Sequence, residues 1–158
     1  MDAPSQVPLS SVETLAPGVR VQDQRLANVT LFLFTITDLS RVSIDVWIAR
    51  IIAETDKQPR TVPTFWLHDA TACKTMSMSP YLRHNIMNLI RRYPDRVGYN
   101  AIILPKTFVV QVIALFIKTL PTRSKNQLFF NRDEGLKWLQ AVSKPYQVAT
   151  DPALVKSA

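Results

Sequence analysis

Residues 28–37 read NVTLFLFTIT, and this stretch decides how the rest of the chain is interpreted. It is rich in β-branched and aromatic side chains and is almost continuously apolar, as expected for a strand buried on both faces of a sheet. Such a strand needs other elements packed on each side. Asp38 and Ser40 follow it with turn-forming side chains, so we expect the strand to end there.

The segments on either side of this strand predict a hairpin before it and a helix after it. Residues 19–26 form a shorter, more polar strand candidate, and a tight turn at residues 27–28 would make it antiparallel to its partner. Residues 43–53 have apolar side chains at spacings of i, i+3, i+4, i+7 and i+8, beginning at Ile44. That spacing predicts a helix with one buried stripe.

The remainder of the chain alternates between strand-like and helix-like segments. Strands are predicted at residues 62–68, 97–104 and 127–130, and helices over residues 79–93, over residues 107–120 and after the capping residue Asn131. Strand–helix–strand alternation implies right-handed crossovers and a mainly parallel sheet. The predicted fold class is therefore α/β: a single-domain, mixed, mainly parallel sheet of about five strands with four helices.

The two ends of the chain differ in composition from its middle. Residues 1–17 are rich in Pro and Ser and lack periodicity, which predicts a flexible leader. Residues 145–158 contain Pro145 and Pro152 among small and polar residues, which predicts a tail. One α/β domain is therefore expected over residues 18–144, and 158 residues suit one domain better than two.

Composition excludes several classes of protein. The single cysteine, Cys73, excludes an internal disulfide and a Cys-rich zinc site, and two histidines exclude most His-based metal clusters. Three glycines cannot form a Walker loop or a dinucleotide fingerprint. The most apolar run, residues 108–117, is about half of the ~20 residues that a membrane span needs, and residues 1–11 do not resemble an export signal. We expect a cytoplasmic protein without metal or cofactor.

The net charge of +7 is unevenly distributed. Residues 70–132 contain ten basic residues and one acidic residue, Asp95, whereas the rest of the chain carries nine basic and eleven acidic residues. This basic part could attract an anionic partner, or it could be an ordinary solvated surface. The solvated surface is the favoured interpretation, and nucleic-acid binding is not expected because the aromatic and basic residues form only a short cluster.

The order of elements resembles the STAS domain family, the fold of bacterial anti-anti-sigma factors, and especially its divergent STAS-like branch. The resemblance covers roughly residues 19–143. It rests on the element order, on LFFNRDEGLKWLQ (residues 128–140) and on RYPDRVGYNAIIL (residues 92–104). In that family, partner-switching members are phosphorylated on a Ser or Thr in the loop after the central strand, usually following an Asp. The matching stretch here is HDATACKTMSMSP (residues 68–80), which is longer and has no glycine, and in it Asp69 and Thr71 are nearest that motif.

Candidate site residues gather where the strands of such a sheet end. The carboxyl ends of parallel strands share one rim, where ligands bind, and helix N-termini there favour anions. The loops containing Asn131 and Arg132 also reach this rim, although ordinary helix capping would explain the same residues. A metal shared by two carboxylates is not expected, because a third ligand is missing. The residues predicted to bind a partner or ligand are Asp38, Asp69, Thr71, Ser77, Ser79 and Lys106.

Two functional hypotheses follow. The resemblance implies a non-catalytic regulatory module that binds a protein partner, such as an anti-sigma-type kinase or another regulator, with Thr71 as the switch. No enzyme is expected, because His68 and Asp69 point to opposite faces of a strand and cannot form a catalytic dyad. The alternative is a small-ligand or nucleotide-binding domain that uses the strand ends and Lys106. The apolar helix over residues 107–120 could form a homodimer through Val110, Ile113 and Ile117, or these residues could be buried within one chain.

Overall fold

A single six-stranded sheet organises the chain, and its strands lie side by side in the order in which they occur in the sequence. The computed structural model describes residues 9–74, 77–107 and 109–147. The elements are β1 (Glu13–Ala16), β2 (Val19–Leu26), β3 (Val29–Ile36), α1 (Arg41–Lys57), β4 (Thr64–Asp69), α2 (Pro80–Arg92), β5 (Gly98–Ile103), α3 (Val109–Lys118), β6 (Lys125–Phe129) and α4 (Arg132–Gln147). The first three strands pair antiparallel, and β3 to β6 pair parallel.

Strand β3 lies inside the sheet, as its sequence predicts. Its side chains alternate between the two faces, so that Phe32 and Phe34 enter one core cluster while Leu31 and Leu33 enter the other. It pairs with β2 through the tight turn at Ala27, whose φ of 55° is left-handed, and with β4 on its other side. The hairpin and the parallel crossover are both confirmed.

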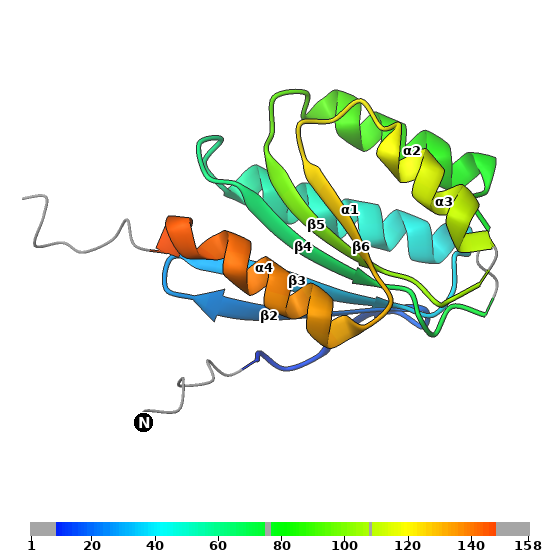
Figure 1. The fold of residues 1–158 in the computed structure, drawn as a ribbon, viewed down its shortest axis with the longest axis horizontal. Coiled ribbons are helices and arrows are strands. Elements are labelled where there is room, and N and C mark those ends of the chain that lie inside the picture. Colours follow the sequence, from blue (N-terminus) through cyan, green and yellow to red (C-terminus); the bar gives the residue numbers. More distant parts are fainter. Residues whose placement is uncertain (1–8, 75–76, 108, 148–158) are drawn as a thin grey trace, which may run out of the picture.

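Helices cover both faces of the sheet, but unequally. Helix α4 packs by itself on one face, and α1, α2 and α3 cover the other (Figure 1). On the α4 side, Leu139 is fully buried against residues of β3, β4 and β5. Serine side chains begin two of the helices on the other side: Ser40 caps α1 and Ser79 caps α2. The predicted mixed α/β architecture is thus present.

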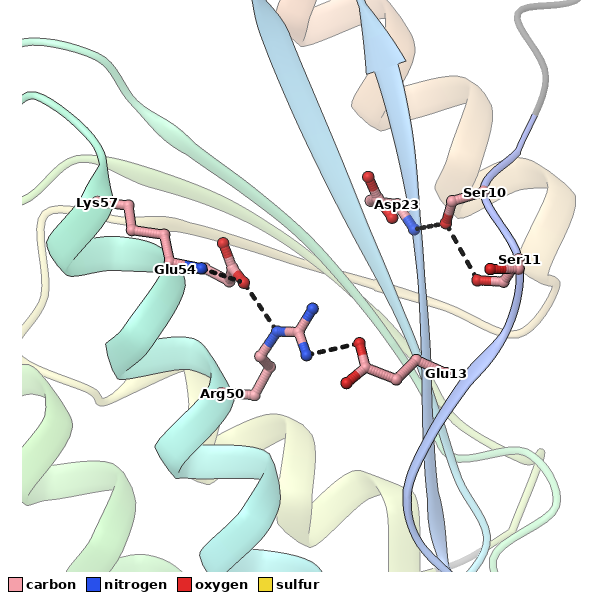
Figure 2. A network of polar contacts seen from close by, with 7 residues as sticks. All are labelled: Ser10, Ser11, Glu13, Asp23, Arg50, Glu54 and Lys57. Carbon is pink, nitrogen blue, oxygen red and sulfur yellow. Dashed lines mark hydrogen bonds and ion pairs between the residues drawn. The ribbon is translucent and has the colours of Figure 1, made fainter.

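The sheet has one more strand than predicted. Residues 13–16, assigned from the sequence to a flexible leader, form the edge strand β1. Arg50 of α1 holds this strand through an ion pair with Glu13 at 2.7 Å, and the backbone N–H of Asp23 donates to Ser10 Oγ at 2.9 Å (Figure 2). Only one of the four residues of β1, Ala16, is buried, so this edge strand lacks the apolar alternation that would have revealed it. Residues 1–8 of the predicted leader lie outside the described residues.

The last helix extends past the predicted start of the tail. Helix α4 continues through Pro145 to Gln147, and the Tyr146 hydroxyl lies 3.2 Å from that of Tyr99. Proline lacks an N–H, but near the end of a helix this removes only one backbone hydrogen bond. The boundary therefore lies later than residue 145 in sequence. Residues 148–158 of the predicted tail lie outside the described residues.

Helix α3 lies over the sheet with its apolar side inward. Ile113 and Ile117 are buried in the core cluster on the face of β4 and β5, whereas Leu115 is exposed. Burial within one chain, one of the two alternatives for this helix, therefore holds for Ile113 and Ile117. The side chain of Val110 is outside the described residues. Among the helices that the structure describes, none is long and apolar enough to cross a membrane.

Candidate functional site

Asp69 is the centre of a hydrogen-bonded cluster at the carboxyl end of β4. It is 7% exposed. Its Oδ1 accepts from the backbone N–H of Thr71 at 3.0 Å and from Thr71 Oγ1 at 2.6 Å. Its Oδ2 accepts from Arg132 Nη1 at 2.9 Å, and the same nitrogen donates to Thr35 Oγ1 at 3.3 Å. One arginine at the start of α4 therefore joins the ends of β3 and β4.

These contacts keep Asp69 ionised. Burial alone would raise the pKa of its carboxyl group, but hydrogen bonds from Thr71 and the hydrogen bond and charge of Arg132 outweigh burial, so the pKa is lowered. The arrangement leaves the Thr71 side chain exposed while its hydroxyl donates to a carboxylate. The Asp69 carboxylate thus lies between the hydroxyl of exposed Thr71, on Oδ1, and the cation Arg132, on Oδ2.

The other predicted site residues do not join this cluster. Asp38 accepts from Ser43 Oγ at 2.6 Å and from the backbone N–H of Ser40 at 3.0 Å, and these hydrogen bonds from Ser43 and Ser40 lower its pKa. Asp38 therefore stabilises the start of α1. Lys106 is exposed, with Nζ 5.8 Å from the centre of the Phe130 ring. Ser79 accepts from the backbone N–H of Leu82 and caps α2.

Of the six predicted residues, the structure brings only Asp69 and Thr71 into direct contact. Ser77 is exposed in the loop before α2. Arg132 was recognised in the sequence as a rim residue, but not as the partner of Asp69. Thr35 was missed, because it sits inside a continuous β pattern and only the register Thr35↔Asp69 brings it to the rim.

His68 points to the opposite face of the sheet from Asp69, as strand geometry predicts. It lies on the face that α1, α2 and α3 cover. Trp47 Nε1 donates to His68 Nδ1 at 3.3 Å, and the ring stacks on Phe34 at 5.7 Å between centroids. Burial lowers the pKa of His68 to about 4, against a smaller opposing effect of its hydrogen bond with Asn100. His68 is therefore neutral at pH 7, with its proton on Nε2.

A cavity of about 210 Å³ lies beside His68, between the sheet and helices α1, α2 and α3. We call it the sheet–helix cavity. Its helix side is mostly aliphatic, and its sheet side includes Trp66, His68 and Asn100. Arg96, just before β5, lies at its wall. Nothing in the sequence revealed this space, because a cavity depends on how far helices sit from a sheet.

The described residues hold no group of three or more His, Cys, Asp or Glu side chains that could bind a metal ion. Cys73 is buried and forms no disulfide. Its burial suits a small hydrophobic side chain rather than a reactive thiol. The chemistry of the rim is therefore that of hydrogen bonds and charge at Asp69, Thr71 and Arg132.

The arrangement of strands and helices matches a solved structure. That structure is of an uncharacterized protein from the DUF3478 family, with a SpoIIAA-like fold, from Shewanella loihica PV-4; it aligns with a TM-score of 0.55 over 82% of this chain and 99% of its own, at 16% sequence identity. This chain has the SpoIIAA-like fold. That is the fold of anti-anti-sigma factors and STAS domains, which the sequence pattern resembles, so the predicted STAS-like fold is confirmed.

The likeness extends to the fold and no further. No protein-family model matches the sequence, and no curated protein matches it significantly. At 16% identity, the STAS-like architecture places the rim and the sheet–helix cavity in a known framework without assigning either of them a role.

Proposed function

We propose that the chain is a non-catalytic STAS-like module that binds a regulatory protein partner through the loop after β4 and helix α2, with Thr71 as the residue whose modification switches binding. The observation that carries this proposal is the cluster of Thr71, Asp69 and Arg132 at the exposed rim. A threonine hydroxyl held 2.6 Å from a carboxylate cannot carry a phosphate in the same geometry, because two anions would then meet.

Phosphorylation of Thr71 would rearrange this cluster. A phosphate adds a charge of about −1.5 to −2 at neutral pH and three strong acceptor oxygens. The phosphate would be repelled by Asp69 and attracted to Arg132, which lies at the same rim and is one-third exposed. The loop backbone at Thr71, now held by Asp69 Oδ1, would lose that hydrogen bond. A local charge would thereby change the shape of the loop that presents α2.

The exposed surface of helix α2 suits a protein partner with an acidic surface. Its exposed side carries Arg83, His84 and Arg91 around a shallow depression that Met87 and Phe116 also line. Basic residues around an apolar centre suit a partner surface that offers carboxylates around an apolar side chain. This face lies next to the loop that Thr71 begins. An anti-sigma-type kinase or another regulator is the partner class expected for it.

The test compares Thr71→Glu and Thr71→Ala with the wild type in affinity purification from cells, with quantitative mass spectrometry of the bound proteins. The expected result is a partner whose recovery changes at least tenfold with Thr71→Glu and little with Thr71→Ala. Thr61→Glu is the matched control, because Thr61 is also exposed but lies in the turn before β4, at the other end of this strand from Asp69. If both Thr71 variants recover the same proteins in wild-type amounts, Thr71 is not a switch.

A second measurement tests the binding surface separately from the switch. Arg83→Glu combined with Arg91→Glu reverses the charge of the exposed α2 face without touching the Asp69 cluster. We expect this variant to lose the same partner at low salt. Lys137→Glu combined with Lys144→Glu, the same change of net charge at exposed positions of α4 across the sheet, should retain it. Equal losses for the two faces would point to a response to net charge instead of a docking site.

A further inference from the structure

Arg96 has a buried edge with which no side chain of the described residues forms a hydrogen bond. Its Nη1 donates to the backbone carbonyl of Gln58 at 3.3 Å. Its Nε and Nη2 are shielded from solvent and have no hydrogen-bond partner within the described parts of the chain. Burial lowers the pKa of this guanidinium group and Arg60 adds to the effect, while Tyr93 and the charge of Asp56 oppose it only in part. Arg96 is half-buried as a whole, but its two shielded donors are costly unless an acceptor pairs with them.

The carboxylates near Arg96 are occupied elsewhere. Asp56 accepts from the Tyr93 hydroxyl at 2.6 Å and from Arg92 at 3.2 Å, and Asp95 lies 3.8 Å from the exposed Arg123. The free edge of Arg96 consists of Nε and Nη2, which are adjacent donors on one side of the planar group. Two parallel N–H groups of this kind match a carboxylate, which accepts from both at once.

Arg96 stands at the polar end of the sheet–helix cavity. The wall beside it is formed by Thr64, Thr122 and Ser124, near the starts of β4 and β6. Toward the opposite ends of the strands the lining becomes mostly apolar. Ala70 and Leu104 directly follow β4 and β5 there, and Leu82 lies on α2. The cavity thus has one cationic, hydroxyl-rich end and one mostly apolar end.

The polar side chains in the middle of the cavity are already paired. Asn100 Nδ2 donates to Asn126 Oδ1 at 2.7 Å, and His68 is held by Trp47 and by Asn100. These side chains therefore do not need a ligand to satisfy their hydrogen bonds. Arg96 is different, because it lines the cavity and two of its donors are buried without a hydrogen-bond partner among the described residues. We therefore expect the polar group of a ligand to lie beside Arg96.

We propose that the sheet–helix cavity binds an amphipathic carboxylate, with its carboxylate on the Nε and Nη2 edge of Arg96 and its hydrocarbon chain beneath α2 and α3. In the structure this edge is shielded from solvent, so the proposal requires the Arg96 side chain to turn toward the cavity when the acid enters. An apolar cavity of about 150 Å³ already holds a benzene molecule, so 210 Å³ accommodates a hydrocarbon chain of several carbons. A nucleotide does not fit this pattern, because one buried guanidinium and an aliphatic wall cannot satisfy several phosphates.

The proposal is tested with decanoate and its uncharged counterpart 1-decanol, both below the concentration at which they aggregate. Binding is followed by calorimetry and by tryptophan fluorescence, since Trp47 and Trp66 line the cavity while Trp138 belongs to the core on the other face. We expect saturable binding of decanoate at least tenfold tighter than that of decanol. The same affinity for both, or binding of neither to the wild type, would overturn the proposal.

Variants then locate the site. Arg96→Gln should weaken decanoate at least tenfold and leave decanol unchanged, whereas Arg123→Gln, the control at a neighbouring exposed arginine, should bind both as the wild type does. Ile102→Trp, which fills the cavity from β5, should abolish binding of both compounds. If Arg123→Gln weakens decanoate as much as Arg96→Gln does, the acid is held by surface charge and the site is wrong. If Arg96→Gln does not fold, two results test the proposal: the wild type must bind decanoate more tightly than decanol, and Ile102→Trp must bind neither.

Discussion

His68 has both ring nitrogens engaged inside the molecule. Trp47 donates to Nδ1, and Asn100 forms a hydrogen bond that favours protonation. Burial nevertheless dominates and lowers the pKa to about 4, from its usual 6.5. The folded state therefore resists a proton that the unfolded chain accepts readily, and this difference links the stability of the protein to pH.

The first prediction concerns this linkage. Because the pKa is lowered on folding, the stabilisation is complete above pH 6.5 and is lost as the pH falls from 6.5 toward 4. We expect the wild type to lose about 1–3 kcal/mol of unfolding free energy across this interval, at about 1.4 kcal/mol per pKa unit. His68→Gln should lose much less. Urea denaturation at pH 7.5, 5.5 and 4.5 measures the difference.

His84 is the matched control for this experiment. It is exposed on α2, where it contacts only Asn88. We expect His84→Gln to keep the pH dependence of the wild type. If His84→Gln flattens the curve and His68→Gln does not, the acid sensitivity does not arise in the sheet–helix cavity.

The second prediction concerns Arg132. Arg132→Gln leaves the nearly buried carboxylate of Asp69 without its cation, so we expect a loss of about 1–2 kcal/mol at pH 7, less than for a fully buried pair because Arg132 is one-third exposed. Asp69 has a lowered pKa, so its stabilising effect is present above the usual value of 3.8 and disappears as the pH falls through the folded-state value. The gap between wild type and variant should accordingly close in strong acid.

Arg123→Gln provides the comparison for the ion pair. Arg123 and Asp95 are both exposed and 3.8 Å apart, and exposed pairs contribute about 0–1 kcal/mol. Chemical denaturation of the two variants side by side therefore separates a structural pair from a solvated one. A loss at Arg132 no larger than the loss at Arg123 would mean that the rim cluster does not hold β3 and β4 together.

At the scale of elements, the seating of α4 on the sheet depends on Gly135. A Cβ at this position would lie 2.4 Å from Ile103 Cδ1, closer than packed atoms approach. Gly135 thus allows the first turn of α4 to contact β5 directly. Leu139, one turn later, continues the same contact and is fully buried.

This contact reverses the usual effect of a helical glycine. Replacing glycine by alanine inside a helix normally stabilises by up to about 1 kcal/mol. Here we expect Gly135→Ala to destabilise by about 1 kcal/mol, because Ile103 is itself fully buried and its Cδ1 atom has little room to move away from the added Cβ. Thermal and urea unfolding measure the change. Ala141→Gly, at an exposed position of the same helix, measures helix propensity alone and should lower the unfolding free energy by about 1 kcal/mol. If Gly135→Ala stabilises the protein, the close packing of α4 on β5 is contradicted.

At the scale of the molecule, the two faces of the sheet are packed differently. Helix α4 lies on one face, and α1, α2 and α3 lie on the other (Figure 1). The side chains of α4 pack into the core of their face, whereas the sheet–helix cavity lies under the three other helices. An unfilled space sacrifices dispersion contacts and lowers stability. A protein that retains such a space is less stable than its fold permits, which is common where a site must bind.

The last prediction follows from this asymmetry. Ile102→Phe adds volume to the cavity from the middle of β5, so we expect it to raise the unfolding free energy by about 0.5–1 kcal/mol and to weaken decanoate binding. Urea denaturation and calorimetry on the same preparation check both effects. A variant that is destabilised would show that the space is already filled in solution. Leu139→Phe, on the tightly packed face, should destabilise instead.

Much of the fold was accessible from local patterns. The run NVTLFLFTIT predicted the buried strand, the spacing that begins at Ile44 predicted α1, and Asn131 predicted the cap of α4, where it accepts from Asp133 N–H at 2.8 Å. Strand β1 escaped because an exposed edge strand needs no apolar alternation. The pairing of Asp69 with Thr71 could be anticipated, since the two residues are two positions apart in one loop.

The alternation of strands and helices follows from the amino-acid order alone, because periodicity and capping are properties of neighbouring residues. Which distant residues meet depends on the folded core: Arg132 with Asp69 and Thr35, and Arg96 with the cavity. These depend on strand register and on the distance between helices and sheet, which arise only when the whole core packs. The rim cluster and the unsatisfied arginine therefore became visible only in three dimensions.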